Sequence, residues 1–118
     1  MSMMKAKPIR QASGKQPSVA DLEARATEVA GLLGALANPR RLIILCRLSM
    51  AGECGVGVLA DAVGISQSAL SQHLAVLRTQ GIVQTRRDGL NIFYSISDPQ
   101  TRKLMRALEK IFCQPEKK

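Results

Sequence analysis

The chain has 118 residues, 46% hydrophobic and 22% charged, a composition that fits one soluble globular domain with a modest core. Lysine and arginine number 17 against 9 acidic residues, and the net charge of +8 favours a polyanionic partner, most simply nucleic acid. Only 3% of residues are aromatic and none is tryptophan, so the core must be aliphatic. This composition favours helices over an all-β sandwich.

Residues 1–18 are polar and basic and include two prolines and a glycine, which predicts a disordered basic tail. Such a tail either only solubilises the chain or acts as an arm that touches DNA. No apolar segment follows the basic N-terminus, and no run of residues reaches transmembrane length. We therefore expect a cytoplasmic protein with no membrane partner, reduced thiols and a single folded domain over residues 19–114.

Two helices are predicted before residue 53. Ser18 is a candidate cap for the first, whose apolar residues recur every three or four positions. These residues are Leu22, Ala26, Val29, Leu33 and Leu36. Asn38 and Pro39 predict the start of the second helix, which carries Cys46 among leucines and isoleucines and ends at Gly52.

Residues 56–96 predict two short helices followed by a hairpin. Gly64 separates the helices, and Ser66 caps the second helix. Asp88 and Gly89 predict a hairpin turn, and basic residues directly precede this turn. A last helix begins at Asp98-Pro99 and stops before Pro115. The predicted order is α-α-α-α-β-β-α, a mainly α chain with a small β-hairpin, which is typical of a winged helix-turn-helix.

The second helix of the turn is predicted to enter a DNA major groove, because its outer face carries short polar groups that can bond base edges. The arginines of the hairpin would contact phosphates or the minor groove. The residues predicted to bind DNA are Gln67, Ser68, Ser71, Gln72, His73, Arg78, Arg86 and Arg87. The alternatives are a merely solvated polar face and a winged helix used only for protein contacts.

The stretches LANPRRLIIL, SQSALSQHLAVLRTQGIVQTRRDG and IFYSIS resemble the ArsR/SmtB family of bacterial winged-helix repressors over about residues 20–114. The resemblance implies a homodimer, built by the first and last helices, that represses transcription. It would bind an inverted repeat in a double-stranded DNA operator and leave it when an inducer arrives. The chain carries no compact nucleophile–base motif, so we expect no enzyme activity and no cofactor.

Many members of this family sense metals, either through a Cys-x-Cys motif before the turn helices or through Asp, His and Glu on the last helix. Gly55, Val56 and Gly57 stand at the first of these motifs, and the last helix has no histidine. His73, the only histidine, lies on the presumed recognition helix. We therefore predict no metal site.

Cys46 and Cys113 match the pattern of the BigR/SqrR/HlyU subgroup of this family. The resemblance implies that they form a redox switch, closed as a disulfide or polysulfide bridge within one subunit by persulfides, other reactive sulfur species or oxidants. Taken alone, each cysteine is more often a small packing residue. The alternative is a metal- or metalloid-responsive repressor that binds a soft ion through Cys46, Cys54 and Cys113. Cys54 has no counterpart in the subgroup's pattern.

Overall fold

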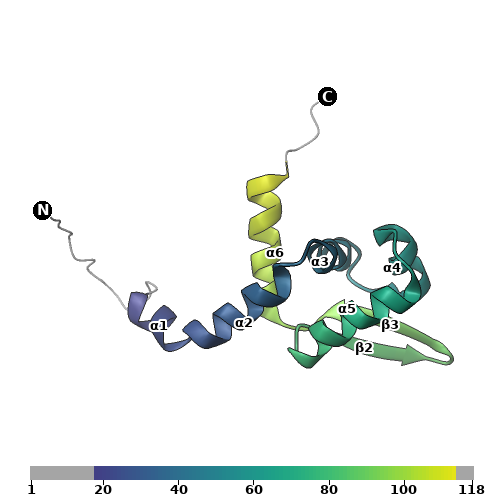
Figure 1. Ribbon diagram of the computed structural model, residues 1–118, viewed down its shortest axis with the longest axis horizontal. Helices are drawn as coiled ribbons and strands as arrows, with labels where there is room; N and C mark the ends of the chain where they lie inside the picture. Colours follow the sequence, from purple (N-terminus) through teal and green to yellow (C-terminus); the bar gives the residue numbers. More distant parts are fainter. Residues whose placement is uncertain (1–17, 114–118) are drawn as a thin grey trace, which may run out of the picture. The chain divides into compact units, whose positions relative to one another are not determined.

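The computed structural model describes residues 18–113, and within this range the chain divides after Ala30 into two compact units. Residues 1–17 of the predicted tail, residue 114 and Pro115 lie outside the described residues. Figure 1 colours the chain from its N-terminus to its C-terminus and labels its helices and the strands β2 and β3. The elements in chain order are α1 (Val19–Ala24), α2 (Ala26–Leu36), α3 (Pro39–Ala51), β1 (Cys54–Gly55), α4 (Val56–Val63), α5 (Gln67–Thr79), β2 (Val83–Asp88), β3 (Asn91–Ile96) and α6 (Pro99–Phe112).

The fold is the predicted winged helix-turn-helix, with two differences from the expected order. The first helix is interrupted at Arg25, whose φ of −109° and ψ of 14° lie outside the helical range, so α1 and α2 are separate helices. A third strand, β1, pairs with β3 and gives a sheet of order β1-β3-β2. Two-residue strands have no periodicity of their own, and for this reason the sequence did not predict β1.

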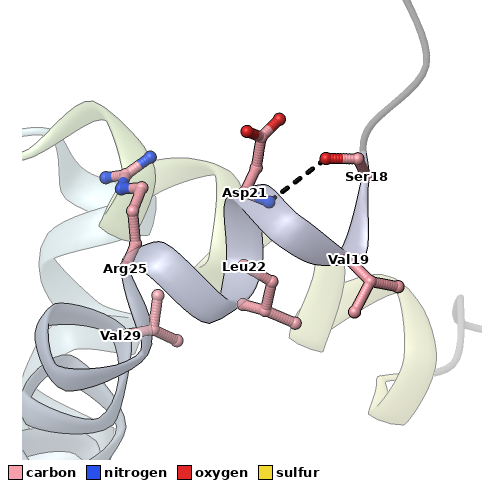
Figure 2. Close-up of a pocket in the computed structure, with 6 residues that line it drawn as sticks. All are labelled: Ser18, Val19, Asp21, Leu22, Arg25 and Val29. Atoms are coloured by element: carbon pink, nitrogen blue, oxygen red, sulfur yellow. Dashed lines mark hydrogen bonds between the residues drawn. The ribbon is translucent and has the colours of Figure 1, made fainter.

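The first unit consists of α1 and the start of α2. The Ser18 hydroxyl accepts a hydrogen bond from the Asp21 amide at 3.1 Å, which confirms the predicted cap. Figure 2 shows a pocket in this unit, in which Val19, Leu22 and Val29 point away from Asp21. Val19 and Leu22 are 71% and 57% exposed, so this unit presents apolar side chains to solvent.

In the second unit the helix starts follow from local chemistry. The Asn38 side-chain oxygen accepts hydrogen bonds from the amides of Arg40 and Arg41, and Pro39 occupies the first turn of α3, as predicted. The Ser66 hydroxyl likewise accepts from the Ala69 amide at 3.0 Å and starts α5. These caps satisfy amide groups that have no partner inside the helix.

The core of the second unit forms around α3, which packs against α4, α5, α6 and β3. Ile44, Leu45 and Leu48 of α3 are at most 1% exposed. The neighbouring Ile43 is 41% exposed, so the face of α3 that carries Ile44 is the one turned to the core.

The turn between α4 and α5 has the conformation that the sequence predicted. Gly64 has a φ of 81° and ends α4, and the amides of Gly64 and Ile65 both donate to the Ala60 carbonyl. Leu70, Leu74 and Leu77 of α5 are buried, as their spacing indicated. These contacts fix α5 against the core and leave its opposite face to solvent.

The hairpin formed by β2 and β3 lies beside α5 (Figure 1). Its strands pair in register from Val83–Ile96 to Asp88–Asn91, with Gly89 and Leu90 as the loop. Gly89 has a φ of 64°, which fits the predicted hairpin turn. Within residues 18–113, no single helix is long and apolar enough to span a membrane, although α2 and α3, bent by 95°, would together have the necessary length and composition.

We expect Gly64→Ala to lower the free energy of unfolding by about 1 kcal/mol or more, because a side chain at positive φ is strained. The strain is conformational, since a Cβ at Gly64 would have no atom within 4 Å. Urea unfolding followed by circular dichroism measures the change. Gly57→Ala is the matched control, because Gly57 lies in α4 without positive φ and should keep or slightly raise stability. Equal stabilities of both variants would contradict this interpretation of the turn.

Candidate nucleic-acid interface and thiol pair

The exposed face of α5 carries the predicted base-reading residues. Gln67, Ser68, Ser71 and Gln72 are exposed, and His73 is half-buried. No carboxylate lies on this helix, so nothing on α5 repels phosphates. Arg78, also exposed, lies in the last turn. The structure thus brings this part of the predicted set onto one helix and orients all but His73 toward solvent.

The two arginines of the wing differ in their surroundings. The Arg86 guanidinium donates to both carboxylate oxygens of Glu53, at 2.8 and 2.9 Å, and lies 4.8 Å from the centre of the Phe93 ring. This hydrogen-bonded pair lowers the pKa of Glu53 and raises that of Arg86. The Arg87 side chain is exposed and has no ion pair or hydrogen-bond partner among residues 18–113. Arg87 is therefore the wing arginine whose charge is free for a phosphate.

Two features of the wing were not predicted from the sequence. Glu53, which holds Arg86, is 33 positions away along the chain, and no local pattern reveals such a pairing. Leu90 is 96% exposed at the tip of the hairpin. The sequence did contain a signal for this residue. A hairpin turn does not require an apolar residue, so a leucine in the loop of a basic hairpin indicates a separate role.

Cys46 and Cys113 come from the two helices α3 and α6, which pack against each other. Cys46 is half-buried on α3, whereas Cys113 is exposed at the C-terminal end of α6, and both thiols are free. Burial raises the pKa of the Cys46 thiol, and the negative charges of Glu109 and Cys113 raise it further, against a lowering by Arg47. The two predicted switch cysteines thus lie on or directly after helices that pack against each other.

Cys54 stands apart from this pair in the sheet. It lies on β1 opposite Tyr94 of β3, and burial raises the pKa of its thiol. Within the described part of the chain, no three histidine, cysteine or acidic side chains are grouped so that they could hold a metal ion. The three thiolates of the alternative metal-responsive interpretation are therefore not assembled in this structure.

A winged helix-turn-helix with a polar recognition helix and a free arginine on its wing defines the class of DNA-binding transcriptional regulators. The family model described as bacterial regulatory protein, arsR family, matches residues 38–85. The biofilm growth-associated repressor of Xylella fastidiosa strain Temecula1 is 48% identical over 97 residues, which span 82% of this chain and 84% of that protein. The chain belongs to the arsR family; it is a transcriptional regulator and not an enzyme, as predicted.

Solved structures agree with this assignment. The transcriptional repressor BigR from Xylella fastidiosa has a TM-score of 0.77 and 46% identity, over 83% of this chain and 99% of that one. Reduced HlyU from Vibrio cholerae N16961 has a TM-score of 0.74 and 41% identity, over 80% of this chain and 98% of that one. The chain is thus similar to the subgroup that the sequence resemblance indicated.

Arg87→Ala is expected to lower the slope of log affinity for duplex DNA against log salt concentration by about one unit, the effect of one lost phosphate contact. Arg86→Ala should change the slope by less, because the Arg86 charge is already paired with Glu53. Fluorescence anisotropy titrations at several salt concentrations measure both slopes. Arg40→Ala, at an exposed position outside the predicted interface, is the control. A larger change for Arg86 than for Arg87 would contradict the division of roles.

Proposed function

We propose that this regulator is a homodimeric repressor that binds an inverted repeat in double-stranded DNA and is released by bridging of Cys46 and Cys113. Persulfides derived from sulfide, or oxidants, would be the inducers. The observation that carries the proposal is the pair of free thiols on elements that pack against each other, Cys46 on α3 and Cys113 directly after α6.

DNA recognition in this proposal is divided between α5 and the wing. Gln67, Ser68, Ser71, Gln72 and His73 read base edges in the major groove, where glutamine suits adenine. Arg78 and Arg87 contact phosphates. Leu90 is an additional candidate, because an exposed leucine at a wing tip can pack against the sugar edges of a minor groove. Arg86 holds the wing in position through Glu53.

The dimer interface in this proposal uses apolar side chains that the second unit leaves uncovered. Ile111 and Phe112 at the end of α6 are 64% and 76% exposed, and Leu33 of α2 is 51% exposed. Exposed apolar groups of this size at one helix end are costly in water and are typical of an interface. The occupant would be a second copy of the chain, as the family resemblance implied.

Release from DNA follows from where the bridge would lie. α3 packs against both α4 and α5 and carries Cys46, while α6 carries Cys113 and the candidate dimer contacts. A bond between the two cysteines would fix α6 against α3 and change the angle between the dimer contacts and α5. Half-site spacing on DNA depends on this angle, and affinity therefore falls.

Gln72→Ala is expected to relax base preference, with a loss of about 1–3 kcal/mol of discrimination at the contacted base pair. The measurement selects binding sites from a random duplex pool with the unmodified chain and compares its affinities for single-base variants of the selected site. Arg87→Ala is the contrast, because it should weaken binding to all of these sequences equally. Loss of preference in both variants to the same degree would contradict the groove assignment.

Treatment of the reduced protein with a low-molecular-weight persulfide is expected to lower affinity for the selected site about 5- to 150-fold, the usual range of such coupling. The chain with Cys46→Ser and Cys113→Ser should keep its affinity, because it cannot form the bridge. Cys54→Ser should respond as the unmodified chain does. Peptide mapping of the treated protein identifies the bridged pair. An equal loss of affinity in the double variant would reject the switch.

A further inference from the structure

The two arginines of the wing lie on opposite faces of the sheet. Neighbouring residues of a strand point to opposite faces, whereas residues paired across an antiparallel ladder share a face. Arg87 therefore shares a face with Val83, which is buried in the core. Arg86 shares the other face with Phe93, its partner in the register. We call the face of Arg87 the core-side face and the face of Arg86 the outer face.

On the outer face, the Arg86 side chain crosses β3 to reach Glu53. The sheet order β1-β3-β2 places β3 between the other two strands, and Glu53 directly precedes β1. The guanidinium lies 4.8 Å from the centre of the Phe93 ring and donates to the two Glu53 carboxylate oxygens at 2.8 and 2.9 Å. Two parallel hydrogen bonds hold an arginine in one orientation, which a single contact does not. Glu53 thus fixes the position of the Arg86 charge and neutralises it.

The two faces of the wing consequently differ in charge. The charged residues of β2 and β3 are Arg86 and Asp88, which alternate onto the outer face, and Arg87 on the core-side face. Together with Glu53, the outer face carries one positive and two negative groups, whereas the core-side face carries one positive group. The core-side face therefore attracts phosphates, and the outer face does not.

The core-side face is also the face beside the recognition helix. Val83 belongs to the same buried cluster as Leu74 and Leu77 of α5, and α5 packs against β2. A duplex bound by α5 is accordingly approached by the wing from the side that carries Arg87. The outer face, with Arg86 and Glu53, lies on the reverse of the sheet.

We propose that Glu53 is a specificity-determining residue, which keeps Arg86 from binding phosphates and so lowers the affinity for non-specific DNA. This inference rests on the proposed function, in which α5 and the wing bind DNA. Non-specific binding is electrostatic, and the protein can then present any of its faces to the duplex. An unpaired Arg86 would add a phosphate contact to such complexes. It would add less to the specific complex, because α5 in the major groove fixes the orientation of the wing.

The effect matters because a repressor must find its operator among many competing sites. A genome offers about 10⁶–10⁹ non-specific sites, so occupancy of the operator depends on the ratio of specific to non-specific affinity. A carboxylate that neutralises a surplus arginine raises this ratio without any contact to a base. Glu53 acts in this way through Arg86, and its effect should disappear when Arg86 is removed.

The first test compares the Glu53→Gln chain with the unmodified chain on two duplexes, one of random sequence and one carrying the selected site. For the random duplex, the slope of log affinity against log salt concentration should become steeper by about one unit, the effect of one added phosphate contact. The selected site should gain less, so the ratio of specific to non-specific affinity falls. An unchanged slope on the random duplex, or an equal gain on both duplexes, would overturn the proposal.

A double-variant comparison identifies Arg86 as the group that is released. In the Glu53→Gln chain, Arg86→Ala should lower the slope for the random duplex by about one unit and so restore the original value. In the unmodified chain the same substitution should change the slope much less, because Glu53 already holds the arginine. Equal decreases in the two backgrounds would show that Glu53 does not withhold Arg86.

Asp61→Asn is the matched control for net charge. Asp61 is an exposed carboxylate of α4 without an ion pair among residues 18–113, so its replacement adds the same charge but releases no arginine. Its slope should change less than that of Glu53→Gln, and an equal change would reject the role of the ion pair. Circular dichroism checks that each variant is folded, and Glu53→Ala replaces Glu53→Gln if the glutamine does not fold.

A measurement without DNA separates this inference from the proposed function. The hydrogen-bonded Arg86 lowers the pKa of Glu53, so Arg86→Ala should raise that pKa in an NMR titration of the carboxyl carbon. An unchanged pKa would reject the pairing. A raised pKa, with a salt slope that neither Glu53→Gln nor Arg87→Ala alters, would reject the proposed role of the wing and with it that of Glu53. A slope that only Arg87→Ala alters would reject the role of Glu53 alone.

Discussion

The burial of α3 is the constraint on which the rest of this unit depends. Ile44, Leu45 and Leu48 are almost wholly removed from water, and burial of each stabilises the fold by about 2 kcal/mol. The helices of the DNA-reading turn, the last helix and the sheet all pack against α3. Cys46 lies on the same helix, half-buried beside this core. A change at Cys46 therefore occurs on an element that contacts α4, α5 and α6.

The parts of the fold that the sequence predicted are those governed by local chemistry. The caps at Asn38 and Ser66, the left-handed turn at Gly64 and the buried leucines of α5 each depend on residues within a few positions of one another. Short-range hydrogen bonds and sterics determine these features in the same way in many folds. These local features are sufficient to predict a winged helix-turn-helix without knowledge of any long-range contact.

The parts that the sequence did not reveal depend on contacts between distant segments. Strand β1 exists because Cys54 and Gly55 pair with β3 some forty positions later, and Arg86 of β2 binds Glu53, 33 positions earlier in the chain. The buried position of Ile44 depends on which elements surround α3. Of the candidate site, the polar face of α5 was evident from the sequence, whereas the neutralised charge of Arg86 was not.

The surroundings of Cys46 differ from those expected of a cysteine that only fills space. Burial alone would make it an inert, protonated packing residue. An isolated packing cysteine, however, does not need a second, exposed thiol at the end of the neighbouring helix. Bridging the two cysteines would remove both ionisable thiols. The packing role and the proposed switch are therefore compatible: the reduced thiol fills its place on α3, and the bridge to Cys113 would be a second state of the same residue.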